Sequence, residues 1–563
     1  MLQLSDMRAP VALLLSAALI AGPVWCEDNK SLEVVGQIKS EAFGRSQVMD
    51  TLAGLTDLYG PRLTASPEFK QAADWAMERL KEYGVMNVHA ETWGPFGRSW
   101  SLQQYKLEQM SPRYSHLVAA PLAWSSPTQG EKTGEAVYAP IHPPQSRYDV
   151  NKSMEAFKQY EAEWKGKLKG KIVLSTESKI PKPSTEAPFS RYTDAQLADI
   201  AKAPDPHITN DVAVEELKIP NDPDEARKYL MSLPSSTIDA LWERFDSLGE
   251  EQARFFHDEG VLGVIRADNR AHDGLLFGEA AGPHKTKPIP APPTFIVTEE
   301  QYSRMARLLE KKQPVTLRID LKANVGDHDV DGMNLIGEIP GGKKPDEVVM
   351  IGAHFDSWHT GTGATDNGAG SAVMIEVMRI LKTLNVKLDR TVRIGLWSGE
   401  EEGLYGSKAY VRQHFGDPET MRLKPEHAKL DAYLNLDNGS GKIRGVYLQG
   451  NDAARPLFSE WLQPYHDMGA STISLQNTGG TDHLSFDAVG LPGFQFIQDP
   501  LDYFHVTHHS DVDTYSHAIP EDLMQASAII ATMVYDIANR DEMFPRKPLP
   551  MGPKKPVLSS SAQ

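Results

Sequence analysis

Cysteine is almost absent from this sequence of 563 residues, since Cys26 is the only one. A single cysteine cannot form a disulfide within the chain, and it cannot build a zinc site from several thiolates. Cys26 also lies where a leader is expected to be cleaved, so we expect no cysteine nucleophile. Any metal ion must therefore be held by histidine and carboxylate side chains.

Positively charged residues are fewer than negatively charged ones. The sequence has 58 Lys and Arg against 76 Asp and Glu, which gives a formal net charge of -18. This balance argues against a nucleic-acid groove and against binding to anionic membranes. With 40% hydrophobic and 24% charged residues, the composition is that of a soluble globular protein, and the length suggests more than one domain.

Only one strongly apolar run is present, at residues 10–25 (PVALLLSAALIAGPVW). It is shorter than the ~20 residues that a membrane-spanning helix needs. Its position predicts a signal peptide over residues 1–26 and a periplasmic or secreted protein. A buried N-terminal helix is the alternative. After removal of the signal we expect no membrane association.

The first part of the main domain is expected at residues 27–116. Apolar residues recur at i, i+3 and i+4 between Phe69 and Leu80, which predicts a helix, and Gly84 is placed to end it. A short strand should follow at residues 87–91.

Residues 117–325 have a different character. A polar stretch at about residues 178–250 separates short strand-like runs, which lie at 171–175, 260–266, 294–298 and 315–321. We interpret this block as an inserted small β-rich domain with a helical excursion. Its segment PIPAPP (288–293) cannot lie inside a central strand.

Strands and helices alternate in residues 326–543. Strands are expected at 348–353, 391–397, 432–436 and 494–497, and helices at 368–384, 406–414, 454–468 and 520–539. Such alternation predicts an α/β fold with a mainly parallel mixed sheet sandwiched by helices. The tail, residues 544–563, has the composition of a disordered end.

Side chains that can bind metal follow the predicted strands of this last part. They are His354 with Asp356, Asp366 in GTGATDNGAG, the Glu400-Glu401-Glu402 run, Asp437, and His509 in HVTHHSDVDT. Taken singly, each residue is more often a turn, a helix cap or a solvated side chain. Ligands in open α/β sheets bind at the carboxyl ends of the strands, where these loops meet. Their joint placement therefore indicates a metal site.

Four segments carry a family resemblance: 354–370 (HFDSWHTGTGATDNGAG), 390–403 (RTVRIGLWSGEEEG), 435–441 (NLDNGSG) and 508–514 (HHSDVDT). They resemble the zinc exopeptidase family that includes bacterial leucyl aminopeptidase. Together with GPRLTASPE (60–68), the first segment is most similar to the carboxypeptidase Q (plasma glutamate carboxypeptidase-like) group. The strand pattern of residues 117–325 is similar to the protease-associated domain often inserted in these enzymes. The resemblance implies the zinc exopeptidase fold.

The resemblance also implies two zinc ions. Asp366 would bridge them, His354 and Asp437 would complete one site, and Glu401 and His509 the other. His508 competes with His509, but the family pattern His-Ser/Thr-x-x-Asp-Thr fits the register of His509.

Two further residues receive catalytic roles from the resemblance. Asp356 would accept the second ring N–H of His354 and so fix its tautomer. Glu400 would be the general base that takes a proton from a water activated by the two ions. Glu402 has no matching role and is expected to be exposed.

Three residues are weaker candidates for contact with the substrate: Asp482, His483 and Tyr503. A structural turn before Phe486 explains the first two equally well.

The preferred function is an exported two-zinc exopeptidase, an aminopeptidase or dipeptidase that acts on dipeptides or short peptides. A carboxypeptidase and a glutaminyl cyclase-like enzyme with one metal are the alternatives. A receptor-like ectodomain that has lost ligands is disfavoured, because the ligand set is complete. The implied partners are peptide substrates and no nucleic acid; a homodimer stays open.

Overall fold

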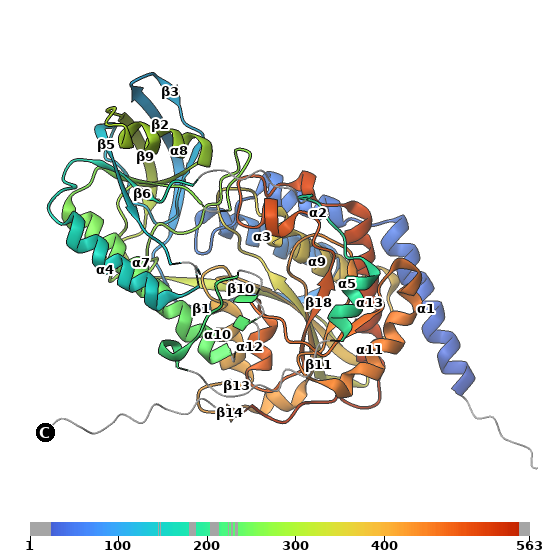
Figure 1. The fold of residues 1–563 in the computed structure, drawn as a ribbon. Coiled ribbons are helices and arrows are strands. Elements are labelled where there is room, and N and C mark those ends of the chain that lie inside the picture. Colours follow the sequence, from blue (N-terminus) through green and yellow to red (C-terminus); the bar gives the residue numbers. More distant parts are fainter. Residues whose placement is uncertain are drawn as a thin grey trace, which may run out of the picture.

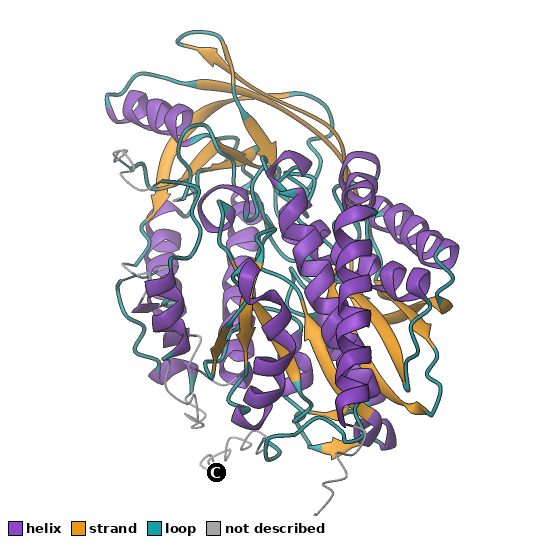
Figure 2. Cartoon of the chain, turned by 90° about the vertical axis from the view of Figure 1, so that its right-hand side faces the viewer, coloured by secondary structure: helices purple, strands orange, loops and turns teal. Residues whose placement is uncertain are grey.

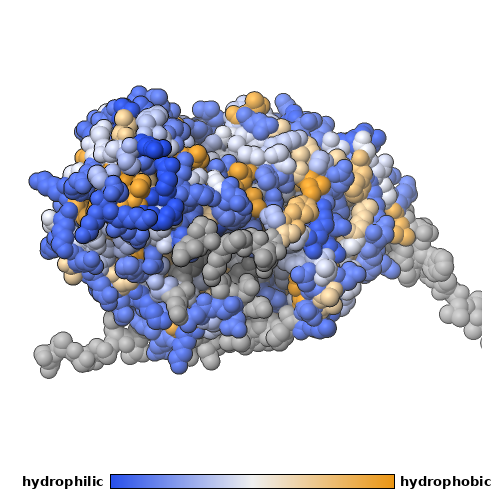
Figure 3. Space-filling model, turned by 45° about the horizontal axis from the view of Figure 1, so that its top comes forward, coloured by the Kyte–Doolittle hydropathy of each residue, from blue (hydrophilic) through white to orange (hydrophobic). Residues whose placement is uncertain are grey.

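The structure is a computed structural model that describes residues 24–550, except 145, 147, 180–186, 203–212, 223–224, 227–228, 231–232, 234 and 269. Residues 1–23 of the predicted signal peptide and residues 551–563 of the predicted tail lie outside the described residues. Within the described part of the chain, no helix is long and apolar enough to cross a membrane. The face in Figure 3 is mainly hydrophilic, and its apolar residues form small separate groups.

The first sheet has eight strands in the order β1-β10-β12-β11-β15-β18-β16-β17. The four central strands, β12, β11, β15 and β18, run parallel, and antiparallel pairs join β10 to β12 and β18 to β16. The strand bounds are β1 (Met86–Gly97), β10 (Val330–Ile339), β11 (Lys344–His354), β12 (Arg390–Trp397), β15 (Leu430–Asn435), β16 (Ile443–Tyr447), β17 (Thr472–Ser474) and β18 (Gly493–Gln498).

Helices cover both faces of this sheet (Figures 1 and 2). Alternate residues of β11 point to opposite faces: Val349 and Ile351 join the core formed with α9 and α13, whereas Met350 packs with the residues of α10 and α12. All six residues of β15 are buried, as expected for a parallel strand that is covered on both sides. The predicted mainly parallel, mixed α/β sheet is therefore confirmed.

The helices around the first sheet are α1 (Val24–Gly44), α2 (Val48–Ala53), α3 (Pro67–Glu82), α9 (Ala369–Leu384), α10 (Tyr405–His414), α11 (Arg455–Leu462), α12 (His483–Asp487) and α13 (Pro520–Asn539). Three of the four helices predicted in residues 326–543 are confirmed as α9, α10 and α13. The fourth, predicted at 454–468, is an α-helix only over α11 and continues as a 3-10 helix over Gln463–Met468. Gly84 follows α3 with a left-handed φ of 80°.

The second sheet also has eight strands, in the order β3-β2-β9-β5-β6-β7-β8-β4. The bounds are β2 (Trp100–Ser111), β3 (Ser115–His116), β4 (Ala119–Pro121), β5 (Lys132–Ile141), β6 (Ile172–Thr176), β7 (Gly263–Arg266), β8 (Thr294–Val297) and β9 (Thr316–Val325), and the helices are α4 (Val150–Trp164), α5 (Asp194–Ala201), α7 (Ser235–Glu259) and α8 (Glu299–Glu310). Its strands β2 and β5 carry charged and polar residues on their exposed side, so they were not expected from apolar runs.

Two boundaries differ from the sequence prediction. β2 pairs with β9, so the second sheet begins at Trp100, before the expected boundary at residue 117. The chain stays packed after residue 543, because Phe544 is buried against Phe458 and Phe494.

A buried ion pair joins α1 to α9. Arg379 contacts Glu376 through Nε at 2.7 Å and Nη2 at 2.9 Å, and its Nη1 lies 2.7 Å from Oε1 of Glu41. The three side chains are at most 5% exposed. Arg45, whose side chain is 67% exposed, contacts the other carboxylate oxygen of Glu41 and so supplies the second positive charge for the two carboxylates. Removal of Arg379 would leave Glu376 buried without its cation, which is costly.

We predict that Arg379→Met lowers the free energy of unfolding by about 3–5 kcal/mol, because Glu376 loses its cation while still buried. Urea or thermal denaturation measures the change. Arg412→Met, on an arginine of α10 that is 58% exposed, is the matched control and should change stability little. Equal stability of both variants would contradict the role given to this ion pair.

Candidate metal centre

The carboxyl ends of the parallel strands gather the predicted ligands. His354 is the last residue of β11, Asp437 follows β15, and Glu401 lies in the turn after β12. Asp366 reaches the same edge from the short segment Ala364–Gly368, which leads into α9. Because the three strands run parallel, their ends lie at one edge of the sheet.

Asp366 lies between two imidazole rings. Its Oδ1 is 3.2 Å from Nε2 of His354, and its Oδ2 is 3.3 Å from Nε2 of His509. On the first side, His354 Nε2 is also 3.5 Å from Oδ1 of Asp437; on the second, His509 Nε2 is 3.0 Å from Oε2 of Glu401. The five predicted ligands thus form one cluster with Asp366 at its centre.

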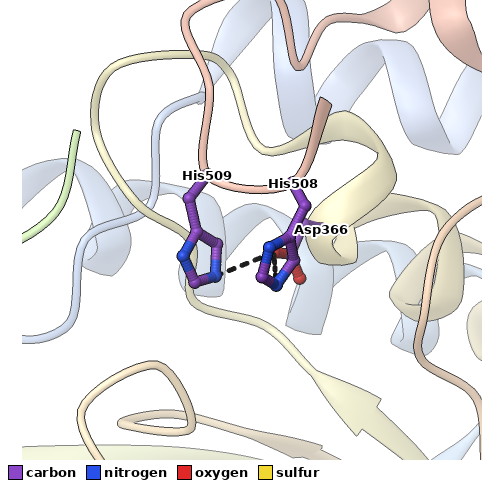
Figure 4. A group of neighbouring side chains, drawn as sticks. All are labelled: Asp366, His508 and His509. Atoms are coloured by element: carbon purple, nitrogen blue, oxygen red, sulfur yellow. Dashed lines mark ion pairs between the residues drawn. The ribbon is translucent and has the colours of Figure 1, made fainter. Parts of the chain in front are cut away.

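His508 and His509 occupy the same loop, and their rings stack with centroids 3.8 Å apart. In Figure 4 both rings face Asp366, yet Nε2 of His508 is 3.8 Å from the Asp366 carboxylate, compared with 3.3 Å for His509. His509 also contacts Glu401 and His508 is the more exposed of the two. These distances favour His509 over His508 as the metal ligand.

The expected contact of the Asp356 carboxylate with His354 is not made. Nδ1 of His354 donates to the backbone oxygen of Asp356 at 3.1 Å, while the carboxylate oxygen Oδ1 is 3.8 Å away. The Asp356 carboxylate instead accepts the backbone N–H groups of Glu400 and Glu401, both at 3.3 Å, and the hydroxyl of Thr64 at 3.0 Å. The backbone oxygen of Asp356 already serves as the acceptor for the ring of His354. The carboxylate of Asp356 therefore stabilises the turn that carries Glu400, the candidate base.

Glu400 lies beside the His354 half of the cluster. One of its carboxylate oxygens lies within 4.8 Å of ligand atoms of both His354 and Asp437. Burial raises the pKa of Glu400 well above its ordinary value; His354 opposes this rise, and the charges of Asp437 and Asp482 add to it.

The expectation that Glu402 is exposed is wrong. Both of its carboxylate oxygens are buried, and neither accepts a hydrogen bond from the described residues. Burial raises its pKa well above the ordinary value, and the nearby charge of Asp356 adds to the rise. A run of three acidic residues suggests a solvated surface, but the turn after β12 folds all three side chains inward.

The candidate substrate residues separate into two groups. Asp482 is fully buried near His354 and Asp437, its two carboxylate oxygens accept no hydrogen bond among the described residues, and burial raises its pKa to about 7. Tyr503 lies against His508, with ring centroids 4.9 Å apart. His483 is also buried, but its Nε2 bonds to the backbone oxygen of Thr478 at 3.0 Å, which fits a structural role.

A small pocket opens on the His509 side of the cluster. It is lined by Trp358, Gly361, Gly363, Asp366, Glu401, His509, Ser510 and Asp513. Three of the five predicted ligands, Asp366, Glu401 and His509, therefore line this pocket.

The donor atoms of the cluster fit divalent metal ions. The Nδ1 atoms of His354 and His509 are bonded to oxygen acceptors, so each ring, in its neutral form, turns an Nε2 lone pair toward carboxylate oxygens. Lone pairs facing lone pairs repel unless a proton or a metal ion lies between them. Among the described residues, Oδ2 of Asp366 and Oε1 of Glu401 are buried and accept no hydrogen bond. Imidazole and carboxylate ligands are those of zinc enzymes.

Two residues near the cluster were missed by the sequence analysis. Thr64 accepts the backbone N–H of Gly399 at 3.0 Å while it donates to Asp356. Glu279, from the second sheet, lies 2.8 Å from Nδ1 of His509. Thr64 belongs to the segment GPRLTASPE (60–68), whose family resemblance could have pointed to it. Glu279 is 230 residues from its partner, and nothing local marks it.

The fold and the cluster define a class: an α/β protein with a histidine and carboxylate metal centre at the carboxyl edge of its sheet. Residues 334–534 match the model of peptidase family M28, so the chain carries a domain of this family. The family predicted from the four motifs is confirmed.

Named relatives agree with this family. The chain is 30% identical over 258 residues to carboxypeptidase Q of Mus musculus, and the match covers 46% of this chain and 52% of the relative. The chain thus spans about half the length of the curated relatives it matches.

Two solved structures share the fold. A peptidase M28 precursor from Shewanella amazonensis SB2B superposes with a TM-score of 0.63 at 24% identity, over 94% of this chain and 100% of that chain. BSAP, a zinc aminopeptidase from Bacillus subtilis, gives a TM-score of 0.52 at 18% identity, over 88% of this chain and 95% of that chain. At these identities the two structures establish the fold.

For a cluster that binds two zinc ions, we predict that His509→Ala removes one of them, because Nε2 of His509 faces both Asp366 and Glu401. His508→Ala, which removes the neighbouring ring of the same loop, should retain two. Metal analysis of the dialysed variants makes the measurement. Loss of an ion from the His508 variant and not from the His509 variant would reverse the assignment.

Proposed function

We propose that this protein is an exported two-zinc exopeptidase that hydrolyses dipeptides or short peptides. The single observation that carries the proposal is the position of Asp366, with one carboxylate oxygen toward His354 and the other toward His509. A carboxylate that faces two separate imidazoles is suited to bridge two cations. Membership of residues 334–534 in peptidase family M28 supports the same chemistry.

The two proposed zinc sites lie on opposite sides of Asp366. His354 and Asp437 hold one ion, and Glu401 and His509 hold the other, with Asp366 shared. Each set combines imidazole with carboxylate, the ligand types of catalytic zinc sites.

Glu400 acts as the general base. When bound, the zinc pair supplies Lewis-acid activation of water and of the scissile carbonyl. Glu400, which is not assigned as a ligand, takes the proton of the attacking water and returns it to the leaving amine. Asp356 keeps Glu400 in place through the backbone N–H groups of Glu400 and Glu401. Thr64 supports this turn from the other side.

We predict that Glu400→Gln keeps both zinc ions and lowers kcat by about 10²–10⁴-fold, because the amide has the shape of the carboxylate but cannot take a proton. Steady-state kinetics and metal analysis on the same preparation measure the two effects. Glu419→Gln, at an exposed carboxylate outside the site, is the control. Turnover near that of the unsubstituted protein would exclude Glu400 as the base.

The family resemblance favours substrates with a free amino end. The segments 354–370 and 60–68 are most similar to the carboxypeptidase Q group, and the chain is 30% identical over 258 residues to carboxypeptidase Q of Mus musculus. This likeness favours an aminopeptidase or dipeptidase, and Asp482 and Tyr503 are the candidate substrate contacts.

We predict that the zinc-loaded protein cleaves free dipeptides and C-amidated peptides, and leaves N-blocked peptides intact. Product release from a matched panel of these three classes makes the measurement. Cleavage of N-blocked but not free-amine peptides would favour a carboxypeptidase. Release of ammonia from peptides with N-terminal glutamine would favour the cyclase.

Three wider features belong to the same proposal. Export follows from the leader expected at residues 1–26. The second sheet corresponds to a protease-associated-like insert, which starts at Trp100 rather than at residue 117. Peptides are the expected partners, and a homodimer is a further option.

A further inference from the structure

Backbone hydrogen bonds hold the loop that carries His509 against residues 276–279, which belong to the part of the chain that forms the second sheet. Phe277 and Ser510 form an antiparallel bridge. The backbone N–H of Gly278 donates to the oxygen of His509 at 3.0 Å, and that of Asp511 donates to the oxygen of Leu276 at 2.9 Å. The segment 276–279, which lies between β7 and β8, therefore fixes the backbone on both sides of the candidate ligand.

The same segment supplies a carboxylate to the ring of His509. Oε1 of Glu279 is 2.8 Å from Nδ1 of His509. Arg270 contacts the same oxygen at 3.2 Å, and its guanidinium lies 4.5 Å from the ring centre of Phe277. Asp268 contacts Nε of Arg270 at 3.1 Å and Nη2 at 3.2 Å. Glu279 is thus itself held in position.

The contact with Glu279 decides which nitrogen of His509 faces the metal centre. A carboxylate accepts but does not donate, so the proton of the neutral ring lies on Nδ1 and the lone pair on Nε2. Nε2 is the atom that lies near Asp366 and Glu401. His509 also has a left-handed backbone, with φ of 64°, which a non-glycine residue adopts only where its surroundings hold it.

The two candidate metal histidines differ in this respect. His354 has a neutral backbone carbonyl, that of Asp356, as the partner of its Nδ1. His509 has a charged carboxylate, and this carboxylate comes from outside the peptidase M28 match at residues 334–534. The Nδ1 partner of His509 thus comes from the part of the chain that forms the second sheet, whereas that of His354 comes from the residues that directly follow β11.

We propose that Glu279 is a positioning residue of the metal centre, through which the second sheet's part of the chain sets the affinity of the ion at His509. The proposal rests on the proposed function, because it takes His509 as a ligand. Partners of this kind orient the ligand ring, and their removal typically costs about 10–100-fold in metal affinity.

Zinc titration against a chromophoric chelator tests the proposal on the full-length protein. We expect Glu279→Ala to raise the dissociation constant of one of the two ions by about 10–100-fold and to leave the other ion unchanged. Glu279→Gln keeps the shape and one acceptor oxygen, so its effect should be in the same direction and smaller. The absorption spectrum of the cobalt-loaded variants should change for one ion only.

Asp273→Asn is the matched control. Asp273 lies on the same loop and carries the same charge, but its carboxylate is 92% exposed and pairs with His272. Its zinc affinities should equal those of the unsubstituted protein. Circular dichroism compares the folds of the variants with that of the unsubstituted protein. If Glu279→Ala does not fold, the zinc affinities of Glu279→Gln test the proposal.

The outcomes separate the two proposals. If the unsubstituted protein binds two zinc ions and the Glu279 variants bind both with unchanged affinity, the role of Glu279 is wrong and the proposed function stands. Equal weakening of both ions would also overturn it, since the inference places Glu279 on one side only. If the unsubstituted protein binds no zinc, the proposed function fails, and this inference fails with it.

Discussion

Two imidazole rings turn their Nε2 atoms toward the carboxylate of Asp366, and two further carboxylates, Asp437 and Glu401, stand within 3.5 Å of those nitrogen atoms. The hydrogen bonds on the opposite ring nitrogens fix this orientation. Negative groups buried at such distances are stable only with compensating positive charge between them. The rest of the peptidase M28 part of the chain produces this arrangement. Its parallel strands, its tight turns and the segment before α9 bring the five predicted metal ligands close together.

The part of the chain that forms the second sheet also helps to position the predicted metal ligands. Its segment at residues 276–279 bonds to the loop of His509, and Glu279 contacts the ring. The backbone conformation of His509 and the direction of its ring thus depend on residues far away in the sequence. A change in the position of the second sheet would therefore act on the ring of His509 directly through Glu279, whereas the Nδ1 partner of His354 lies in the first sheet's part of the chain.

The sequence predicted the strands that lead to the site, because β11, β12, β15 and β18 are apolar and buried on both faces. It missed β10, where polar residues such as Asn334 and Glu338 interrupt the apolar pattern. It predicted the ligand cluster from residues at strand ends. The actual role of Asp356 could not be predicted, since the turn at residue 356 decides whether the carboxylate or the backbone oxygen meets His354. Glu279 was equally hidden, because only tertiary packing brings it to His509.

The most direct test of the account is a crystal structure of the zinc-loaded protein with anomalous scattering recorded at the zinc absorption edge. The account predicts two anomalous peaks, one on each side of Asp366, the first contacted by His354 and Asp437 and the second by His509 and Glu401. A single peak, or a second ion held by His508 with His509 turned away, would contradict it.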